Sequence, residues 1–302
     1  MKNKIKTIII TIILLYLMSF FVARLISGGL EERIISDGIA VIPIVGEISI
    51  NTEDGFFSSG ISANSIVEKL ERANENKGIK AIILDINSGG GGVVASREIV
   101  KAVKEVKKPV IALIREVGAS GAYWIASSAD WIIADEMSIT GSIGVFSSYL
   151  EFSGLLENYN VSYERLVAGE YKDLGVPYRQ LTEREKIMMQ QKLNLIHDFF
   201  IKDVAKNRNL DEIKVRELAN GFFYLGVEGK DLGLVDELGG RKEAIAKAKE
   251  LGNLKNGNLI EYRDEKSIFD FFGKIQNKAF YYMGRGIGVS LVENENKLEI
   301  IA

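Results

Sequence analysis

The sequence predicts an α/β domain built on a mostly parallel sheet, and the order of its apolar segments carries this prediction. Three continuous apolar runs, Ile39–Val45, Ile79–Ile86 and Val110–Ile114, have the length and composition of strands buried on both faces. Two segments with helical spacing of apolar residues, Ser62–Asn76 and Val93–Val106, lie between consecutive runs. Strands that alternate with helices in this way are typical of parallel pairing.

The same alternation continues further along the chain with shorter elements. Small residues at Ala122–Ala129 indicate a helix, and short strands are expected at Trp131–Ala134 and Ile143–Ser147. A long amphipathic helix is predicted over Glu183–Asn207. Thr182 is its predicted N-cap, and the glutamate three residues on completes a capping box. The apolar stripe of this helix is formed by Met189, Leu193, Ile196, Phe200 and Val204.

Composition excludes several classes of function. The chain has 302 residues with a formal net charge of −3, which is enough for one large domain and does not favour a nucleic-acid partner. It contains no cysteine, so disulfides, thiolate catalysis and Cys-ligated metals are excluded. A single histidine, His197, removes most zinc and iron sites. We therefore expect no metal and no cofactor.

The N-terminus has the pattern of a membrane anchor. Three lysines precede an uncharged apolar run from Thr7 to Ala23, and Arg24 follows it. About 17 residues at 1.5 Å each reach roughly 26 Å, near the lower limit for crossing a bilayer. We predict an uncleaved transmembrane helix, with a cleaved signal peptide or a buried helix as alternatives. The charge asymmetry predicts a cytoplasmic N-terminus and an extracytoplasmic remainder at the cell membrane.

The predicted organisation has four parts. Residues 1–27 form a short cytoplasmic stub and the anchor, 28–37 a linker, 38–250 the folded domain, and 251–302 a C-terminal tail. The tail is polar and charged except for an aromatic stretch between Phe269 and Tyr282. An amphipathic helix is expected there, packed on the domain, a neighbouring subunit or the membrane surface.

Two glycine-rich turns, Asn87–Gly92 and Gly118–Ala122, each follow a predicted strand and lead into a helix. In a parallel sheet such turns lie together at the carboxyl ends of the strands, where ligands bind. Ser120 is a candidate nucleophile because small residues surround it at the start of a helix; the alternative is that it caps this helix. Glycine N–H groups in the turns could serve as oxyanion donors, at about 3 kcal/mol each.

A serine nucleophile needs a base, and the choice is narrow. His197 lies inside the long amphipathic helix, where a packed histidine is more common than a catalytic one. A lysine can act as base when burial lowers its pKa by about 3–5 units. Lys172 lies in the segment Val167–Tyr178 before that helix, and Asp173 beside it should point away. From the residues alone, a solvated loop lysine remains the alternative.

Several motifs in a fixed order resemble bacterial and archaeal signal peptide peptidase A. They are Asn87–Ser96, Gly118–Ala126, Thr140–Val145, Gly169–Asp173 and Leu232–Gly239. The resemblance covers about Ile39–Glu250 together with the anchor. Two positions depart from the family pattern, Gly89 in place of proline and Ala122 in place of a second glycine. The first affects the rigidity of the glycine turn, and the second leaves the preceding N–H in place.

The resemblance implies a ClpP/crotonase-like superhelix of repeated β-β-α units and peptide hydrolysis by a Ser–Lys dyad. By position, Ser120 matches the nucleophile and Lys172 the general base. Ser142 matches the residue whose hydroxyl orients the lysine. The N–H groups of Gly91 and Gly121 match the oxyanion hole.

The resemblance also implies partners and substrates. Short members of the family form active sites in a ring-like homo-oligomer, with the lysine supplied by a neighbouring subunit. The implied substrates are apolar, extended peptides, such as signal peptides left in the membrane after secretion.

Two other readings remain open at this point. The pattern Gly90-x-Gly92-x-x-Ala95, with Glu116 about 20 residues on, fits the dinucleotide-binding fingerprint of an oxidoreductase. That reading leaves the serine turn and the anchor unexplained. A crotonase-type acyl-CoA enzyme or an inactive membrane scaffold would keep the fold without proteolysis.

Overall fold

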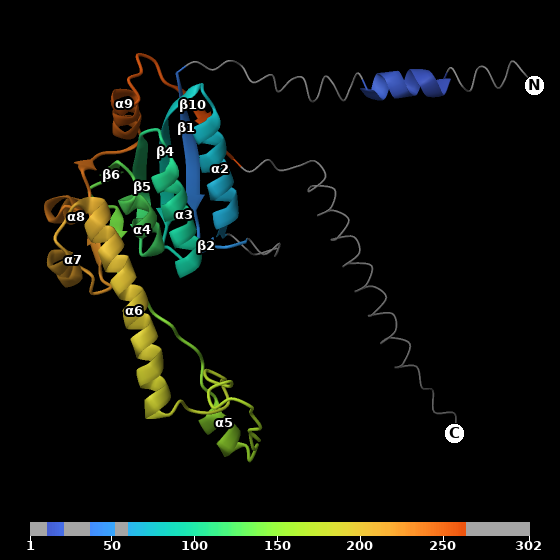
Figure 1. Cartoon of the computed structure of the whole chain (residues 1–302), viewed down its shortest axis with the longest axis vertical. Coiled ribbons are helices and arrows are strands. Elements are labelled where there is room, and N and C mark those ends of the chain that lie inside the picture. Colours follow the sequence, from blue (N-terminus) through green and yellow to red (C-terminus); the bar gives the residue numbers. More distant parts are fainter. Residues whose placement is uncertain (1–10, 21–36, 52–59, 264–302) are drawn as a thin grey trace, which may run out of the picture. The chain divides into compact units, whose positions relative to one another are not determined.

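The computed structural model describes residues 11–20, 37–51 and 60–263 (Figure 1). Residues 11–20 are helical. Within these described ranges, no helix combines the length and apolar character needed to cross a membrane. The predicted anchor Thr7–Ala23 extends beyond the described residues at both ends, and the linker and most of the C-terminal tail also lie outside them.

The sheet confirms the predicted parallel pairing. Six parallel strands lie in the order β10-β1-β4-β5-β6-β9, and β7 pairs in parallel with the end of β5 and antiparallel with β8. These strands are β1 (Gly38–Val45), β4 (Ile79–Ser88), β5 (Val110–Ala119), β6 (Trp131–Ala134), β7 (Ile139–Gly141), β8 (Phe223–Leu225), β9 (Glu237–Leu238) and β10 (Asn258–Glu261). A separate parallel pair is formed by β2 (Ile48–Ser49) and β3 (Ile61–Ser62).

The helices described by the structure are α2 (Ala63–Glu75), α3 (Val93–Glu105), α4 (Gly121–Ser127), α5 (Ser153–Asn158), α6 (Glu183–Arg208), α7 (Glu212–Leu218), α8 (Gly226–Leu232) and α9 (Arg241–Leu251). The capping box predicted for α6 is present. Thr182 Oγ1 accepts from the Glu185 N–H at 3.3 Å, and Glu185 Oε2 accepts from the Thr182 N–H at 2.8 Å. These bonds satisfy N–H groups that the first helical turn leaves unpaired.

Both faces of the sheet are buried, which explains the continuous apolar runs of its central strands. In β1, Ala40, Ile42 and Ile44 belong to the core shared with α2, α3 and α4, whereas Ile39 and Val41 face the core formed with α9. Successive side chains point to opposite faces, so a strand covered on both sides needs apolar residues at every position.

The sheet is wound in one direction. The strands β1, β4, β5 and β6 lie side by side in chain order, and the helices that connect them, α2, α3 and α4, pack on the same face (Figure 1). A doubly wound dinucleotide-binding sheet instead reverses its strand order and places the helices that connect successive strands alternately on both faces, whereas here α9, which follows β9, covers the opposite face. The turns after β4 and β5 therefore open at the same edge, without a point of reversal between them.

Helix α4 is anchored by the C-terminal half of α6. The rings of Trp124 and Phe200 stack with centroids 4.3 Å apart, and Trp124 Nε1 donates to Asp203 Oδ2 at 3.1 Å. All seven residues of α4 are buried. A buried helix held in this way gives the residue before it, Ser120, a fixed position.

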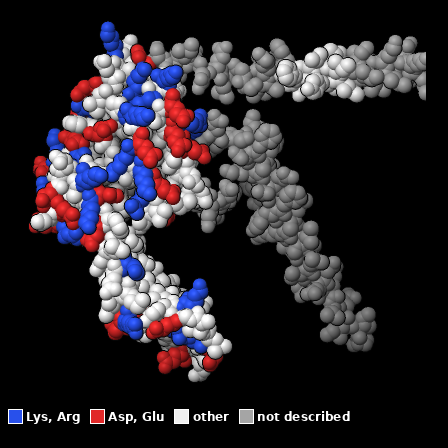
Figure 2. Space-filling model, in the orientation of Figure 1, with Lys and Arg blue, Asp and Glu red and all other residues white. Residues whose placement is uncertain are grey.

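The predicted apolar stripe of α6 is buried only at its C-terminal end. Phe200 and Val204 are buried, but Met189, Leu193 and Ile196 are only partly covered. The two elements that pack most closely on α6, α4 and α7, contact its C-terminal half through Phe200, Asp203 and Asp198. Figure 2 shows few charged side chains over this stretch, whereas Lys, Arg, Asp and Glu are intermixed over the sheet-bearing part.

The predicted strand Ile143–Ser147 is wrong. The strand lies at Ile139–Gly141, and Ser142 ends it with a φ of 49°, in the left-handed region. The following residues leave the sheet, and Phe146 is 87% exposed. The sheet also continues past residue 250, because β10 pairs with β1 and the compact unit ends at Tyr262.

Candidate active site

Ser120 lies at a sharp turn between β5 and α4. Its φ of 53° and ψ of −126° place a non-glycine residue in a sparsely populated conformation, and its N–H donates to the Gly141 carbonyl at 2.8 Å. It occupies the N-cap position of α4, yet its side chain makes no capping hydrogen bond. The structure therefore does not support the helix-cap alternative, because the half-buried hydroxyl does not cap α4.

The two glycine turns lie against each other, as predicted. A Cβ added to Gly90 would lie 2.6 Å from the Gly121 nitrogen and 3.0 Å from the Ser120 Cβ. The turn is also fixed from its other side, because the Ile48 N–H donates to the Gly90 carbonyl at 3.0 Å and the Gly92 N–H donates to the Ile48 carbonyl at 2.8 Å. Only residues without a side chain allow backbones to approach so closely.

Two backbone donors beside Ser120 are unused. Among the described residues, neither the Gly91 N–H nor the Gly121 N–H donates a hydrogen bond. The Gly91 nitrogen lies 3.4 Å from the position that a Cβ on Gly121 would occupy, so the two residues are neighbours. An anion at this point could accept from both groups, which is the arrangement of an oxyanion hole.

Ser142 reaches the same edge of the sheet from the next strand. Ala119 and Gly141 are paired in the ladder between β5 and β7, so Ser120 and Ser142 each follow one member of this pair. Ser142 Oγ donates to the Gly221 carbonyl at 3.1 Å, and its N–H donates to the Phe222 carbonyl at 3.1 Å. The structure thus brings together four of the five predicted site residues: Ser120, Ser142, Gly91 and Gly121.

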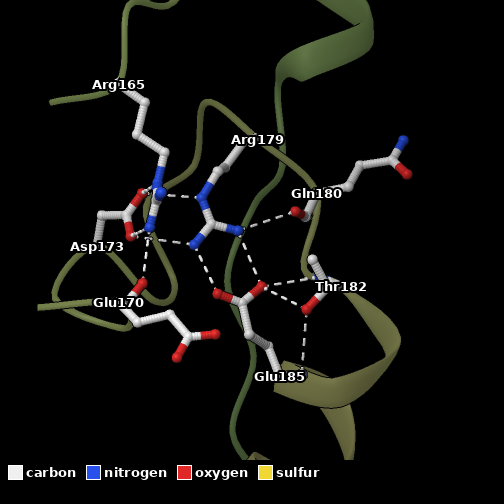
Figure 3. Close-up of polar contacts among 7 residues, drawn as sticks. All are labelled: Arg165, Glu170, Asp173, Arg179, Gln180, Thr182 and Glu185. Carbon is white, nitrogen blue, oxygen red and sulfur yellow. Dashed lines mark hydrogen bonds and ion pairs between the residues drawn. The ribbon is translucent and has the colours of Figure 1, made fainter. Parts of the chain in front are cut away.

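Lys172 lies elsewhere in the single chain. It is exposed in a series of turns, and its N–H donates to the Gly169 carbonyl at 3.0 Å. The neighbouring Asp173 is buried, and Arg165 and Arg179 occupy its carboxylate (Figure 3). The prediction that Asp173 points away from Lys172 stays a prediction, and the partners of the Asp173 carboxylate are these two arginines.

The position of Lys172 follows from its link to α6. Arg179 joins Asp173 to Glu185, in the first turn of α6. Helix α4 instead packs at Phe200, 15 residues further on, which corresponds to about 22 Å along the helix axis. This span exceeds the reach of a lysine side chain, so one chain does not bring Lys172 to Ser120. Figure 1 shows α4 beside the C-terminal half of α6 and α5 near its N-terminal end.

The structure also shows the surroundings of the other groups considered in the sequence. His197 lies on α6, and its buried Nε2 has no hydrogen-bond partner among the described residues. Within the same ranges, no group of three or more His, Cys, Asp or Glu side chains is arranged to hold a metal ion. The glycines of the dinucleotide fingerprint are taken up by contacts with Ile48 and the serine turn.

Sequence reasoning missed two features near the predicted residues. The Ser96 hydroxyl is buried and has no hydrogen-bond partner in the described part of the chain, and its Oγ lies 2.3 Å from the position of a Cβ on Gly121. A polar residue on the apolar face of α3 was the available signal. The cluster of Arg165, Asp173, Arg179 and Glu185 was also missed, because its charges are spread over 21 positions of apparently ordinary loop.

The backbone of Ser120 carries a testable strain. A non-glycine residue in this conformation costs about 1–3 kcal/mol, which glycine avoids at the expense of a more flexible unfolded chain. We expect Ser120→Gly to be about 1 kcal/mol more stable than Ser120→Ala, or about 2 °C in thermal unfolding. Equal or lower stability of the glycine variant would show that Ser120 is not strained.

Comparison with known proteins identifies the class to which this fold and site belong. The model of peptidase family S49 matches residues 102–255, and a Clp protease model matches residues 57–132. The first match covers just over half of the chain. The chain therefore belongs to peptidase family S49 and is a serine-type peptidase. Within that family it is of the signal peptide peptidase A type, as its motifs predicted.

Individual relatives agree with this assignment. A candidate protease of Methanocaldococcus jannaschii is 32% identical over 295 residues, which are 95% of this chain and 92% of that protein. A candidate signal peptide peptidase SppA of Enterococcus faecium is 34% identical over 80% of this chain and 71% of its own length. A solved mutant of a membrane-bound stomatin-specific protease shares the fold, with a TM-score of 0.51, 14% identity, and coverage of 76% of this chain and 99% of that one.

Proposed function

We propose that this chain is a membrane-anchored serine endopeptidase in which Ser120 is the nucleophile and Lys172 the general base. The observation that carries the proposal is the state of Ser120: its hydroxyl does not cap α4, its turn is strained, and it lies beside the N–H groups of Gly91 and Gly121, which donate no hydrogen bond within the described ranges. A serine that only capped its helix would bond its hydroxyl to that helix and would need no backbone donors beside it. A nucleophile needs a hydroxyl that is available for attack and donors that bind the oxyanion.

The reaction follows from these groups. Ser120 Oγ attacks the carbonyl carbon of the scissile peptide bond, and the neutral Lys172 amine accepts the hydroxyl proton. The Gly91 and Gly121 N–H groups stabilise the oxyanion of the tetrahedral intermediate. As the C–N bond breaks, the Lys172 ammonium returns the proton to the leaving amine. A water deprotonated by Lys172 then hydrolyses the acyl-enzyme and frees Ser120.

The base comes from a neighbouring copy of the chain. Within one chain Lys172 is exposed and lies too far from Ser120, as the length of α6 requires. The segment that carries Lys172, between β7 and α6, exposes many large apolar side chains, which favours burial against another subunit. They include Phe146, Leu150, Leu155, Tyr159, Val161 and Leu166. In the assembly, the Ser142 hydroxyl would orient the incoming amine.

The substrates are apolar, extended peptides, such as signal peptides left in a membrane. An aromatic pair supports this class: Phe222 and Phe223 stack at 4.7 Å, are exposed, and flank Ser142 through backbone contacts. The apolar run Thr7–Ala23 would anchor the enzyme with its N-terminus in the cytoplasm and its catalytic domain outside. An anchored enzyme meets such peptides where they accumulate.

Covalent labelling tests the nucleophile. The full chain in mild detergent is treated with a fluorophosphonate probe and mapped by mass spectrometry. We expect a single modified residue, Ser120, and much slower labelling in the Lys172→Ala variant, because the hydroxyl then lacks its base. Labelling at Ser142 in place of Ser120 would contradict the assignment. No labelling at all would favour the inactive scaffold or the acyl-CoA enzyme.

A further inference from the structure

The proposed base lies between two carboxylates, and this placement opposes its function. Glu170 and Asp173 flank Lys172 in the sequence. A nearby negative charge stabilises the ammonium form of a lysine and raises its pKa, whereas a general base must be neutral to accept a proton. A catalytic lysine beside a free aspartate would be a poor base at neutral pH.

Asp173 is not free. It is only 8% exposed, and the guanidinium groups of Arg165 and Arg179 both bind its carboxylate (Figure 3). Arg165 donates from Nε at 2.6 Å and from Nη2 at 2.8 Å. Arg179 donates from Nε at 2.9 Å and from Nη2 at 3.2 Å. Two forked ion pairs on a single buried carboxylate are the strong kind of charge-assisted contact.

The contacts extend on both sides of Lys172. Arg165 Nη2 also donates to the Glu170 carbonyl at 2.7 Å, so this one side chain bonds the residues two before and one after the lysine. Arg179 also donates to Glu185 at 2.7 and 2.9 Å, and Glu185 belongs to the capping box of α6. The turn is thereby fastened to the start of a long helix.

We propose that Arg165 and Arg179 neutralise Asp173 so that Lys172 can act as a base, and that the same contacts hold its turn in place. This inference rests on the proposed function of Lys172. Arg165 and Arg179 are positioning residues, since they act through Asp173 and touch no substrate. The charged groups of the described chain around the turn are Arg165, Glu170, Asp173, Arg179, Arg184 and Glu185.

The cluster keeps its charges over the pH range in which a lysine base works. Hydrogen bonds from Arg165, which has the larger effect, and from Arg179 hold the pKa of Asp173 well below its usual range. Hydrogen bonds from Arg179, which has the larger effect, and from the Thr182 N–H lower the pKa of Glu185 to about 2. Both carboxylates are therefore ionised at every pH above about 5, where they balance the two arginines. Any pH dependence of activity near neutrality then reports on another group.

The inference predicts that substitutions of the arginines and of Asp173 shift the pH profile of kcat/KM in opposite directions. Arg165→Gln or Arg179→Gln leaves one negative charge in excess, so the acid limb of the kcat/KM profile should move up by about 0.5–1 pH unit. Asp173→Asn leaves one positive charge in excess, so the same limb should move down by a similar amount. A fluorogenic peptide with apolar residues around the scissile bond, assayed with the full chain from about pH 6 to 10, gives these profiles.

Two further variants separate charge from geometry. Arg165→Lys keeps the charge but loses the forked contact, and should retain the wild-type limb even if kcat falls. Arg216→Gln is the matched control, because Arg216 also joins two carboxylates, Asp198 at 2.6 Å and Glu212 at 3.0 Å, on a different part of the chain. Its profile should not move.

The outcomes distinguish this inference from the function on which it rests. The electrostatic role would be overturned if the acid limb of the kcat/KM profile stayed in place, or moved in the same direction for Arg165→Gln and Asp173→Asn. In that case an inactive Lys172→Ala variant would still support Lys172 as the base. Near-normal cleavage by Lys172→Ala would instead overturn the proposed base. If one arginine variant fails to fold, the other two substitutions still test the sign.

Discussion

Mixing Ser120→Ala chains with Lys172→Ala chains should restore peptide cleavage that neither variant shows alone. Each single variant is expected to lose at least about 10⁴-fold in kcat, because serine and base act as one unit. In a mixed ring, some sites combine an intact serine from one copy with an intact lysine from the next. With random assembly of equal amounts, half of the serines and half of the lysines are intact, so about a quarter of the sites should work.

Co-expression of the two variants, followed by purification of the mixed assembly, makes this measurement independent of subunit exchange. Separately purified and mixed chains that do not exchange provide the control, and should stay inactive. An inactive co-expressed assembly would show that each chain builds its own site. That result would require a different arrangement of the segment before α6 from the one that the Arg179 contacts now hold.

Local sequence patterns were sufficient to predict the elements that position the nucleophile. Continuous apolar runs marked β1, β4 and β5, because strands covered on both faces need apolar residues throughout. The glycine turns marked the edge at which Ser120 lies, because close backbone contact tolerates no side chain. These signals are local, so they could be recognised without knowing which distant residues pack against them.

The elements that were predicted poorly depend on distant partners. The short strand near residue 140 was placed too late, since its position is set by pairing with the ends of β5 and β8 and not by its own apolar residues. The apolar stripe of α6 extends beyond the residues that are buried against other elements. The spacing of apolar residues along a helix does not show where this burial ends. In the same way β10, at the end of the domain, is defined by β1.

In the candidate site, too, some residues could be predicted from local sequence and others depend on distant partners. Ser120 could be named from its turn, whereas Gly91, Gly121, Ser142 and the basic function of Lys172 were assigned by the resemblance. Its structural environment depends on Arg165 and Arg179, whose spacing fits no helix or strand period. Ion pairs between loops leave no periodic trace in a sequence, so only coordinates reveal them.

Gly91→Ala and Gly121→Ala should both lower peptide cleavage, but only the loss in Gly121→Ala should be reversed by a second substitution. A Cβ on Gly121 would lie 2.3 Å from Ser96 Oγ, which is a side-chain atom, whereas a Cβ on Gly91 would lie 2.1 Å from the Ile48 carbonyl oxygen, which is backbone. Either contact forces a displacement of the donor N–H. We expect each substitution to lower kcat by about 10²–10³-fold, the usual effect of losing one oxyanion donor.

The companion substitution distinguishes the two glycines. Ser96→Ala removes the Oγ and leaves the Ser96 Cβ at 3.2 Å, a contact that small shifts can relieve, so it should restore most of the activity of Gly121→Ala. By itself Ser96→Ala should be neutral or stabilising, because the hydroxyl it removes is buried and finds no hydrogen-bond partner among residues 37–51 and 60–263. The same change should not rescue Gly91→Ala.

Gly89→Ala is the matched control within the same turn, because a Cβ there meets nothing within 4 Å. It should keep near wild-type kcat, which would show that the turn tolerates an alanine where space allows. Full activity of Gly91→Ala in a stable protein would mean that its N–H does not bind the oxyanion. Rescue of Gly121→Ala by Ser96→Ala would then place the remaining donor at the start of α4, because the added methyl group displaces that N–H through its contact with Ser96 Oγ.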